Sequence, residues 1–235
     1  MLQETKVIIL SIKNQTMNLI IAGTGFPEIL TLIQEINNIQ SNSIKILGFV
    51  DDNLKNSERN LYGHNFLGSF EEINKFKDIY VINTISRSMA IRFKSTERLL
   101  KLGAKFCNVI HPLCKLPENN FGVGNIISAG CIFEIGSSLG NHNVFLRNNI
   151  IGHDSKISDY SFFGHGCVVN GHTAINNYCF VGAKSVLGPS INVAQKTVVA
   201  PGTYIGIDTK EKTSYISRPP YVISQTADSS EHFWT

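Results

Sequence analysis

The pattern of apolar and polar residues divides this chain into two halves with different periods. Up to about residue 108, short apolar runs alternate with segments whose apolar residues recur at helical spacing. Because such runs predict strands and such segments predict helices, an alternating order predicts a Rossmann-like α/β half-domain with a parallel sheet. The predicted elements are strand Asn18–Ala22, helix Pro27–Asn37, strand Ile44–Val50, helix Ser69–Phe76, strand Ile79–Ile82, helix Met89–Leu102 and strand Lys105–Ile110.

The second half repeats an apolar residue at every sixth position. The series is Ile127, Phe133, Leu139, Phe145, Ile151, Ile157, Phe163, Val169, Ile175, Val181, Leu187, Val193, Val199 and Ile205. Four positions after each of them stands a small or short polar residue, with Ile191 as the exception. These are Cys131, Ser137, Asn143, Asn149, Ser155, Ser161, Cys167, Thr173, Cys179, Ser185, Thr197, Thr203 and Thr209.

A strict period of six has a direct physical meaning. Six residues form one short strand and one tight corner, so that three units close a triangular coil of eighteen residues. Successive coils stack at about 4.8 Å, the spacing of neighbouring strands, and the stack buries one continuous apolar core. A β-sandwich is the alternative, but its strands alternate with period two and vary in spacing. The pattern therefore favours a parallel β-helix.

Composition excludes several classes of protein. The 235 residues are 43% hydrophobic and 17% charged, which supports a packed core. A net charge of +3, without a basic cluster interleaved with aromatics, argues against nucleic acid as a partner. No apolar run is long enough for membrane insertion, and the first residues lack a secretory pattern, so we expect a cytoplasmic protein. The five cysteines form no CxxC pair, which predicts reduced, mostly buried thiols.

The two periods also set the expected boundaries. Residues 17–108 form the α/β domain, which we expect to bind a nucleotide sugar, and residues 109–209 form the β-helix. Residues 1–16 are an extension without a predicted role, and residues 210–235 are a tail in which the repeat is lost.

Two motifs in the α/β half suggest a ligand site. Gly23-Thr24-Gly25-Phe26 lies between a predicted strand and a predicted helix, which is the context of a phosphate-binding turn, although Glu28 replaces the third glycine of the dinucleotide fingerprint. Asp51 and Asp52 end the second strand, at the sheet edge where ligands of such folds bind. Arg87, after the third strand, is within reach of a phosphate in this arrangement. A tight turn, a cap and a solvated arginine are the plain alternatives.

The hexapeptide repeat, the Gly-x-Gly turn and the Asp-Asp strand end together resemble a known family. The chain is similar, over about residues 17 to 207, to the sialic-acid O-acetyltransferase and bacillosamine N-acetyltransferase family. The resemblance implies a left-handed β-helix, a homotrimer with active sites between subunits, acetyl-CoA as acyl donor and an amino or hydroxyl sugar as acceptor. It also implies that the two aspartates contact the nucleotide sugar.

His153-Asp154 resembles the catalytic segment of that family. An imidazole can take a proton from an attacking amine or hydroxyl near neutral pH, and an adjacent carboxylate can orient the imidazole and stabilise its cation. Successive side chains converge only where the chain turns sharply, as it does at a coil corner. Gly171, eighteen residues after His153, matches the family glycine whose N–H donates to the thioester oxygen. A solvated corner histidine and a turn glycine are the plain alternatives.

The resemblance also implies cofactor contacts in the later coils. Matching positions are Gly182, Ala183, Ala200 and Pro201, and Phe162 stands where some members have a second histidine near the cofactor sulfur. His142, His165 and His172 raise the alternative of zinc, but they show no ligand spacing, so we expect no metal.

The expected function is therefore acetyl-CoA-dependent N-acetylation of an amino sugar carried on a nucleotide. The alternatives are O-acetylation of a sugar hydroxyl and a non-catalytic trimeric module that binds sugar nucleotides.

Overall fold

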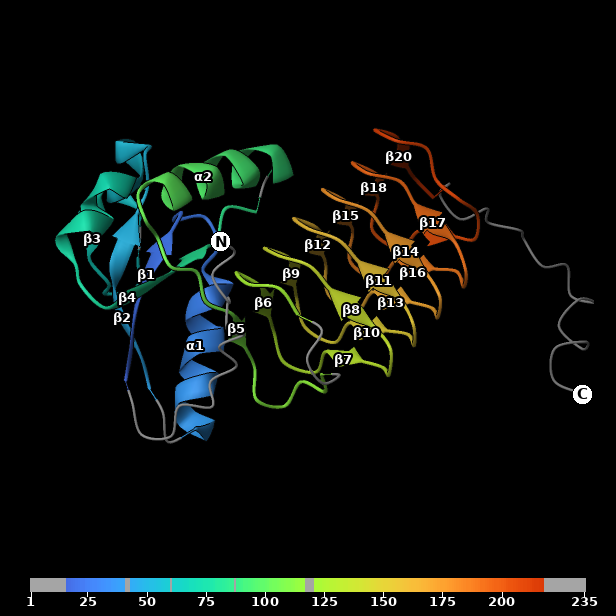
Figure 1. Ribbon diagram of the computed structural model, residues 1–235, viewed down its shortest axis with the longest axis horizontal. Coiled ribbons are helices and arrows are strands. Elements are labelled where there is room, and N and C mark those ends of the chain that lie inside the picture. Colours follow the sequence, from blue (N-terminus) through green and yellow to red (C-terminus); the bar gives the residue numbers. More distant parts are fainter. Residues whose placement is uncertain (1–15, 41–42, 60, 87, 117–120, 218–235) are drawn as a thin grey trace, which may run out of the picture.

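The computed structural model describes residues 16–217 except for 41–42, 60, 87 and 117–120. The fold is an α/β domain followed by a left-handed parallel β-helix (Figure 1). The α/β domain contains a four-stranded parallel sheet in the order β3-β2-β1-β4. Its strands are β1 (Met17–Ala22), β2 (Ile44–Val50), β3 (Phe66–Gly68) and β4 (Ile79–Asn83).

Two α-helices pack against this sheet, α1 through an apolar face and α2 through a mixed face whose buried Ser95 and Thr96 accept hydrogen bonds from the Asn83 Nδ2. Helix α1 (Glu28–Ile39) buries Ile29, Leu32, Ile33 and Ile36, which recur at helical spacing. Helix α2 (Met89–Lys101) begins after Ser88, whose hydroxyl accepts a hydrogen bond from the Ile91 N–H. Two short 3₁₀ helices, η1 (Leu54–Glu58) and η2 (Phe70–Lys75), connect the strands.

Two predicted elements of this half are wrong in detail. The segment predicted as a helix over Ser69–Phe76 forms the 3₁₀ helix η2, preceded by the three-residue strand β3, which was not predicted. The strand predicted over Lys105–Ile110 does not join the α/β sheet as its fourth strand. Phe106 makes an isolated bridge to Val81, whereas β5 (Val109–Ile110) pairs with the β-helix. The first strand of the β-helix therefore lies at the start of the segment 109–209 that was assigned to it, and the single strand predicted over Lys105–Ile110 ran across the boundary between the two domains.

The β-helix consists of three parallel sheets, and the two residues of each strand pair with residues eighteen positions further on between β6 and β19. The first sheet contains β5, β6 (Ile126–Ile127), β9 (Val144–Phe145), β12 (Phe162–Phe163), β15 (Phe180–Val181), β18 (Val198–Val199) and β20 (Ser214–Tyr215). The second contains β7 (Ile132–Phe133), β10 (Ile150–Ile151), β13 (Val168–Val169), β16 (Val186–Leu187) and β19 (Tyr204–Ile205). The third contains β8 (Ser138–Leu139), β11 (Lys156–Ile157), β14 (Ala174–Ile175) and β17 (Asn192–Val193).

The predicted core of the β-helix is confirmed. Every member of the apolar series from Ile127 to Ile205 is buried, and so are the small residues of the second series, because they fill the inside of the corners. Side-chain amides there bond one coil to the next. The Asn125 Oδ1 accepts from the Asn143 N–H, and the Asn143 Oδ1 accepts from the Ser161 N–H. These ladders satisfy polar groups that would otherwise be unpaired in the interior.

The α/β domain covers the first sheet of the β-helix. Ile126, Val144 and Phe162 belong to one apolar cluster with the buried residues of α1. Arg92, on α2, is fully buried at this junction, where its Nε donates to the His142 carbonyl at 2.9 Å and its Nη1 to the Asn83 carbonyl at 2.6 Å. Burial without a carboxylate lowers the pKa of Arg92 to about 9.

Two sequence-based expectations can be compared directly with the structure. The five cysteines are free thiols, and all except Cys114 are buried, as predicted. Burial raises the pKa of Cys107 to about 12, so that this thiol is unreactive at neutral pH. Within residues 16–217, apart from the gaps named above, no helix is long and apolar enough to cross a membrane.

Candidate active site

His153 and Asp154 lie at the corner between β10 and β11, in the turn that joins the second sheet to the third. Asp154 has a positive φ of 57°, a left-handed conformation that turns the chain sharply. The turn brings the two neighbouring side chains together, with the His153 Nδ1 2.9 Å from the Asp154 Oδ2. The convergence expected at a coil corner is therefore present, and both side chains are exposed.

Two further side chains lie at this corner: Glu134 was missed by the sequence analysis, and His172 was considered there only as a possible zinc ligand. The Glu134 carboxylate, one coil earlier, accepts a hydrogen bond from the His153 backbone N–H at 3.0 Å. His172, one coil later, has its Nδ1 3.9 Å from the Asp154 Oδ2. The period of eighteen could have identified His172, because it follows Asp154 by that interval.

The electrostatics of the corner favour an ionised Asp154. Its hydrogen bond with His153 holds the pKa of the Asp154 carboxyl below its usual range, and the nearby imidazole charges of His172 and His153 act in the same direction. An ionised carboxylate on Nδ1 leaves the other ring nitrogen, Nε2, available to accept a proton. The pair therefore has the chemistry of an imidazole base with an orienting carboxylate.

Gly171 lies directly against the His153 ring. A Cβ atom placed on Gly171 would come within 2.6 Å of the His153 Nε2, which is closer than non-bonded atoms approach. The Gly171 carbonyl accepts from Ser190, but the Gly171 N–H donates no hydrogen bond within the part of the chain that the structure describes. A free backbone donor close to Nε2 is the arrangement expected of an oxyanion donor.

The same corner also has the geometry of a cation site. His153, Asp154 and His172 offer one ligand atom each, and these atoms lie within 4.8 Å of one another. All three residues are exposed, and two of them, His153 and Asp154, are hydrogen-bonded to each other directly. The absence of a metal therefore stays a prediction.

The predicted nucleotide-binding residues lie at the carboxyl end of β1 and β2. Gly23 has a φ of +91°, and a Cβ there would meet the Ile85 side chain at 2.7 Å, so glycine is needed for this turn. The Asp51 Oδ2 accepts from the Thr24 N–H at 3.3 Å and from the Asn56 Nδ2 at 2.7 Å. Asp51 therefore ties the glycine turn to the loop after β2. The Phe26 side chain is buried in the core of the domain, so only its backbone could contact a ligand.

Both carboxylate oxygens of Asp52 contact other residues of the chain. Its Oδ2 pairs with the Arg98 Nη1 at 2.5 Å, and its Oδ1 accepts from the Phe70 N–H at 3.2 Å. These contacts are those of the plain alternative, a carboxylate that caps the next segment. Arg87 is outside the described residues. A different cation, Arg59, lies over the turn, with its Nη1 3.6 Å from the position that a Cβ of Gly25 would occupy.

Four of the predicted cofactor residues share one corner. Gly182 and Ala183 lie between β15 and β16, and Ala200 and Pro201 lie one coil later, between β18 and β19. A Cβ on Gly182 would come within 2.4 Å of the Pro201 nitrogen, so the coils are in close contact there. Phe162 lies apart from these four, on the first sheet, where it is buried and stacks on Phe180 with ring centroids 5.1 Å apart.

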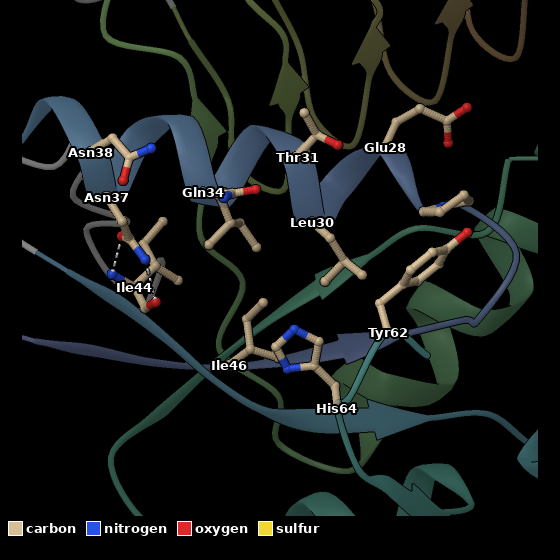
Figure 2. Close-up of a pocket in the computed structure, with 12 residues that line it drawn as sticks. Glu28, Leu30, Thr31, Gln34, Asn37, Asn38, Ile44, Ile46, Tyr62 and His64 are labelled. Atoms are coloured by element: carbon tan, nitrogen blue, oxygen red, sulfur yellow. Dashed lines mark hydrogen bonds between the residues drawn. The ribbon is translucent and has the colours of Figure 1, made fainter. Parts of the chain in front are cut away.

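Hollows flank the α/β domain, and two of them have volumes of about 650 Å³ or more. One, of about 740 Å³, follows α1 and has an apolar floor that includes Leu30 and Ile46, with Tyr62 and His64 on its rim (Figure 2). None of the predicted site residues lines it. The other, of about 650 Å³, lies between the start of α2 and the first sheet of the β-helix. Its lining is mainly apolar and includes Phe93, Tyr178, Phe180 and Val198, together with Lys94 and Lys196.

Comparison with known proteins relates this chain to solved structures only. No protein-family model matches the sequence, and no curated protein does so either. A mutant of perosamine N-acetyltransferase from Caulobacter crescentus, in complex with CoA and GDP-perosamine, is 16% identical with a TM-score of 0.75, and the match covers 88% of this chain and 97% of that one.

Two other structures are similar to a comparable degree. The acetyltransferase domain of PglB from Neisseria gonorrhoeae, in complex with acetyl coenzyme A, is 19% identical with a TM-score of 0.75, and the match covers 87% of this chain and 98% of that one. WeeI from Acinetobacter baumannii is 19% identical with a TM-score of 0.72, and the match covers 88% and 100% of the two chains. At this level of identity the likeness establishes the fold, including the α/β domain and the β-helix.

Proposed function

We propose that this chain is an acetyl-CoA-dependent N-acetyltransferase that acts on the amino group of a nucleotide-linked sugar. The observation that carries the proposal is the corner at which His153 is paired with Asp154 and lies against the free N–H of Gly171. Support comes from the fold, which this chain shares with a perosamine N-acetyltransferase crystallised with CoA and GDP-perosamine. The same comparison favours an amino group over a hydroxyl as acceptor.

In this mechanism His153 and Gly171 have separate tasks. His153 removes a proton from the amine as its nitrogen attacks the thioester carbonyl, and Asp154 stabilises the resulting imidazolium. The Gly171 N–H donates to the oxygen on which negative charge develops. Acetyl-CoA supplies the acyl group, so that a C–N bond forms, the C–S bond breaks and the products are the amide and CoA thiol. His153 returns the proton to the departing sulfur, which leaves the base neutral for the next turnover.

The second hollow is compatible with a CoA arm. Its apolar wall, which includes Phe180 and Val198, suits a pantetheine chain, and Lys94 and Lys196 suit the phosphates. Phe162, the predicted cofactor contact, does not line the hollow but stacks on Phe180 from the preceding coil of the same sheet. For the acceptor, the positively charged Arg59 and the Gly23–Gly25 turn together offer a site for the phosphates of the nucleotide sugar.

We further propose that the active unit is a homotrimer. The outward side chains of the second sheet are all apolar, whereas those of the third sheet are polar or small. The apolar set is Ile132, Ile150, Val168, Val186 and Tyr204, and the other set is Ser138, Lys156, Ala174 and Asn192. Ile135, next to the His153 corner, is also 84% exposed. Such an uncovered apolar strip favours burial against a second copy.

The trimer would also complete the site. His153 lies at one edge of the second sheet, and Gly182 and Ala200 lie at the opposite edge, so one chain holds these two groups apart. When the second sheets of neighbouring subunits pack around a threefold axis, the base corner of one subunit faces the cofactor corner of the next. In this arrangement, the predicted catalytic residues and the predicted cofactor residues meet at a single interface between subunits.

Turnover by a His153→Ala variant tests the proposal. We expect kcat to fall by about 100-fold or more, because the amine then loses its base, while acetyl-CoA still raises the melting temperature of the protein. CoA release is measured with amino and hydroxy sugar nucleotides in parallel, so that the acceptor class is determined in the same assay. Turnover close to that of the wild type would refute the role of His153, and acetylation of hydroxyl acceptors alone would replace N-acetylation with O-acetylation.

A further inference from the structure

The His153 corner contains two imidazoles that share one carboxylate. The Asp154 Oδ2 lies 2.9 Å from the His153 Nδ1 and 3.9 Å from the His172 Nδ1. The two imidazole rings meet edge to face, with centroids 4.8 Å apart and an interplanar angle of 87°. The closer contact is the one between the proposed base, His153, and its carboxylate, Asp154. The proposed mechanism uses neither His172 nor its contact with Asp154.

The backbone fixes the position of His172 relative to Asp154. Both residues adopt the left-handed conformation, with φ of 57° for Asp154 and 59° for His172, and they occupy equivalent turn positions in successive coils. The His172 N–H donates to the His153 carbonyl at 2.9 Å, which joins the two coils at this point. The proximity of the two imidazoles therefore follows from the coil geometry and not only from the rotamers of exposed side chains.

The charged groups around His172 lie mainly on the earlier coils. Asp154 and His153 are its direct neighbours, and Glu134, two coils earlier, is held by its hydrogen bond from the His153 N–H. Lys156 points outward from β11 on the adjoining sheet. The next coil presents Ser190, which is uncharged, at the equivalent turn position. Beyond it, the Asp208 carboxylate accepts from the Asn192 N–H.

We propose that His172 is a positioning residue that shares Asp154 with His153 and thereby sets the pH range over which His153 accepts a proton. One carboxylate cannot fully stabilise two imidazolium ions. When His172 is protonated, it attracts Asp154 and repels positive charge on His153, so His153 stays neutral to lower pH. The inference rests on the proposed function, since it concerns the base of that reaction.

Two substitutions at one backbone position separate the effect of charge from the effect of structure. His172→Asn removes the charge, and His172→Lys makes it permanent. Both residue types already occupy the equivalent left-handed position at other corners, at Asn148, Lys184 and Lys196, so neither is expected to strain the turn. In kcat/KM against pH, the acid limb should move to higher pH in the Asn variant and to lower pH in the Lys variant, by about half a pH unit each.

A second measurement does not depend on turnover. With [13Cε1]histidine labelling, the His153 resonance, assigned from its loss in His153→Gln, is followed through a pH titration of the wild type and both variants. We expect its midpoint to move in the same two directions. Equal or absent shifts in the Asn and Lys variants would overturn the role of His172. Opposite shifts together with normal turnover of His153→Ala would instead preserve the coupling and refute the proposed base.

Discussion

His142 gives the most quantitative prediction, because it is a buried titratable group at the junction of the two domains. Its ring stacks on Tyr160 with centroids 5.0 Å apart and meets Phe106 edge to face. Its Nδ1 has no hydrogen-bond partner among the described residues, while its carbonyl accepts from Arg92. Burial, and next the positive charge of Arg92, lower the pKa of His142 to about 3.

This depressed pKa makes stability dependent on pH in a defined direction. The unfolded chain protonates a histidine at about pH 6.5, whereas folded His142 stays neutral down to about pH 3. Between these values the unfolded state binds one more proton, so the free energy of unfolding falls as the pH falls. From pH of about 7.5 to about 5, the linkage relation assigns a loss of about 2 kcal/mol to this one residue.

A His142→Phe substitution should remove that loss. Phenylalanine keeps an aromatic ring on Tyr160, and aromatic residues already occupy the equivalent left-handed positions at Tyr160 and Tyr178. The free energy of unfolding of the wild type and of the variant is measured by urea denaturation at both pH values and at one protein concentration. The contributions of the carboxylates, which both proteins share, cancel when the two changes with pH are subtracted. The wild type should lose about 2 kcal/mol more than the variant on acidification.

Tyr160→Phe is the matched control, because it changes the neighbouring ring without removing the titrating group. Burial raises the pKa of Tyr160 to about 12, so its hydroxyl does not ionise in the range tested, and the control should keep the pH dependence of the wild type. If His142→Phe and the wild type lose the same free energy between the two pH values, then His142 is not held neutral by burial and the reasoning fails.

Two further predictions concern the corner and the interface. Gly171→Ala should lower kcat by about 10-fold or more, because the added Cβ would lie only 2.6 Å from the His153 Nε2 and would push the ring aside. Acetyl-CoA binding should be retained in a thermal-shift assay, and an unchanged kcat would contradict this placement of the ring. Ile150→Lys, in the apolar strip, should convert the trimer to monomer in light scattering and abolish turnover, whereas Asn192→Lys on the third sheet should do neither; a monomeric wild type would refute the interface.

The β-helix could be predicted from the sequence almost completely because its information is local. Each coil repeats after eighteen residues, so a single apolar position such as Ile127 determines the burial of its successors at Phe145 and Phe163. The α/β half was less predictable, because membership of its sheet depends on distant pairing. The three residues of β3 join the sheet edge beside β2. Phe106 bridges to Val81 of the α/β sheet, but three residues later β5 pairs with the β-helix, and no local pattern marks this change of partner.

In the candidate site, too, features set by local sequence could be predicted, whereas contacts between distant segments could not. The convergence of His153 and Asp154 follows from a sharp corner, and the eighteen-residue interval would have led to His172 as well. Asp52 could not be interpreted from its neighbours, because its partner Arg98 is 46 positions away on α2. Arg59 was missed for a similar reason, since only the fold of the loop after β2 brings it to the glycine turn.

The spacing of the repeat also explains why one chain would not suffice for the proposed reaction. A unit of six advances the chain by one side of the triangle, so the eighteen residues from His153 to Gly171 return it to the same corner. The thirty residues from His153 to Ala183 are five units, which place Ala183 at the opposite edge of the second sheet. In the proposed trimer, an acyl donor at Ala183 would therefore face His153 of another copy of the chain, and the apolar strip between the two corners is the surface that would bring that copy into place.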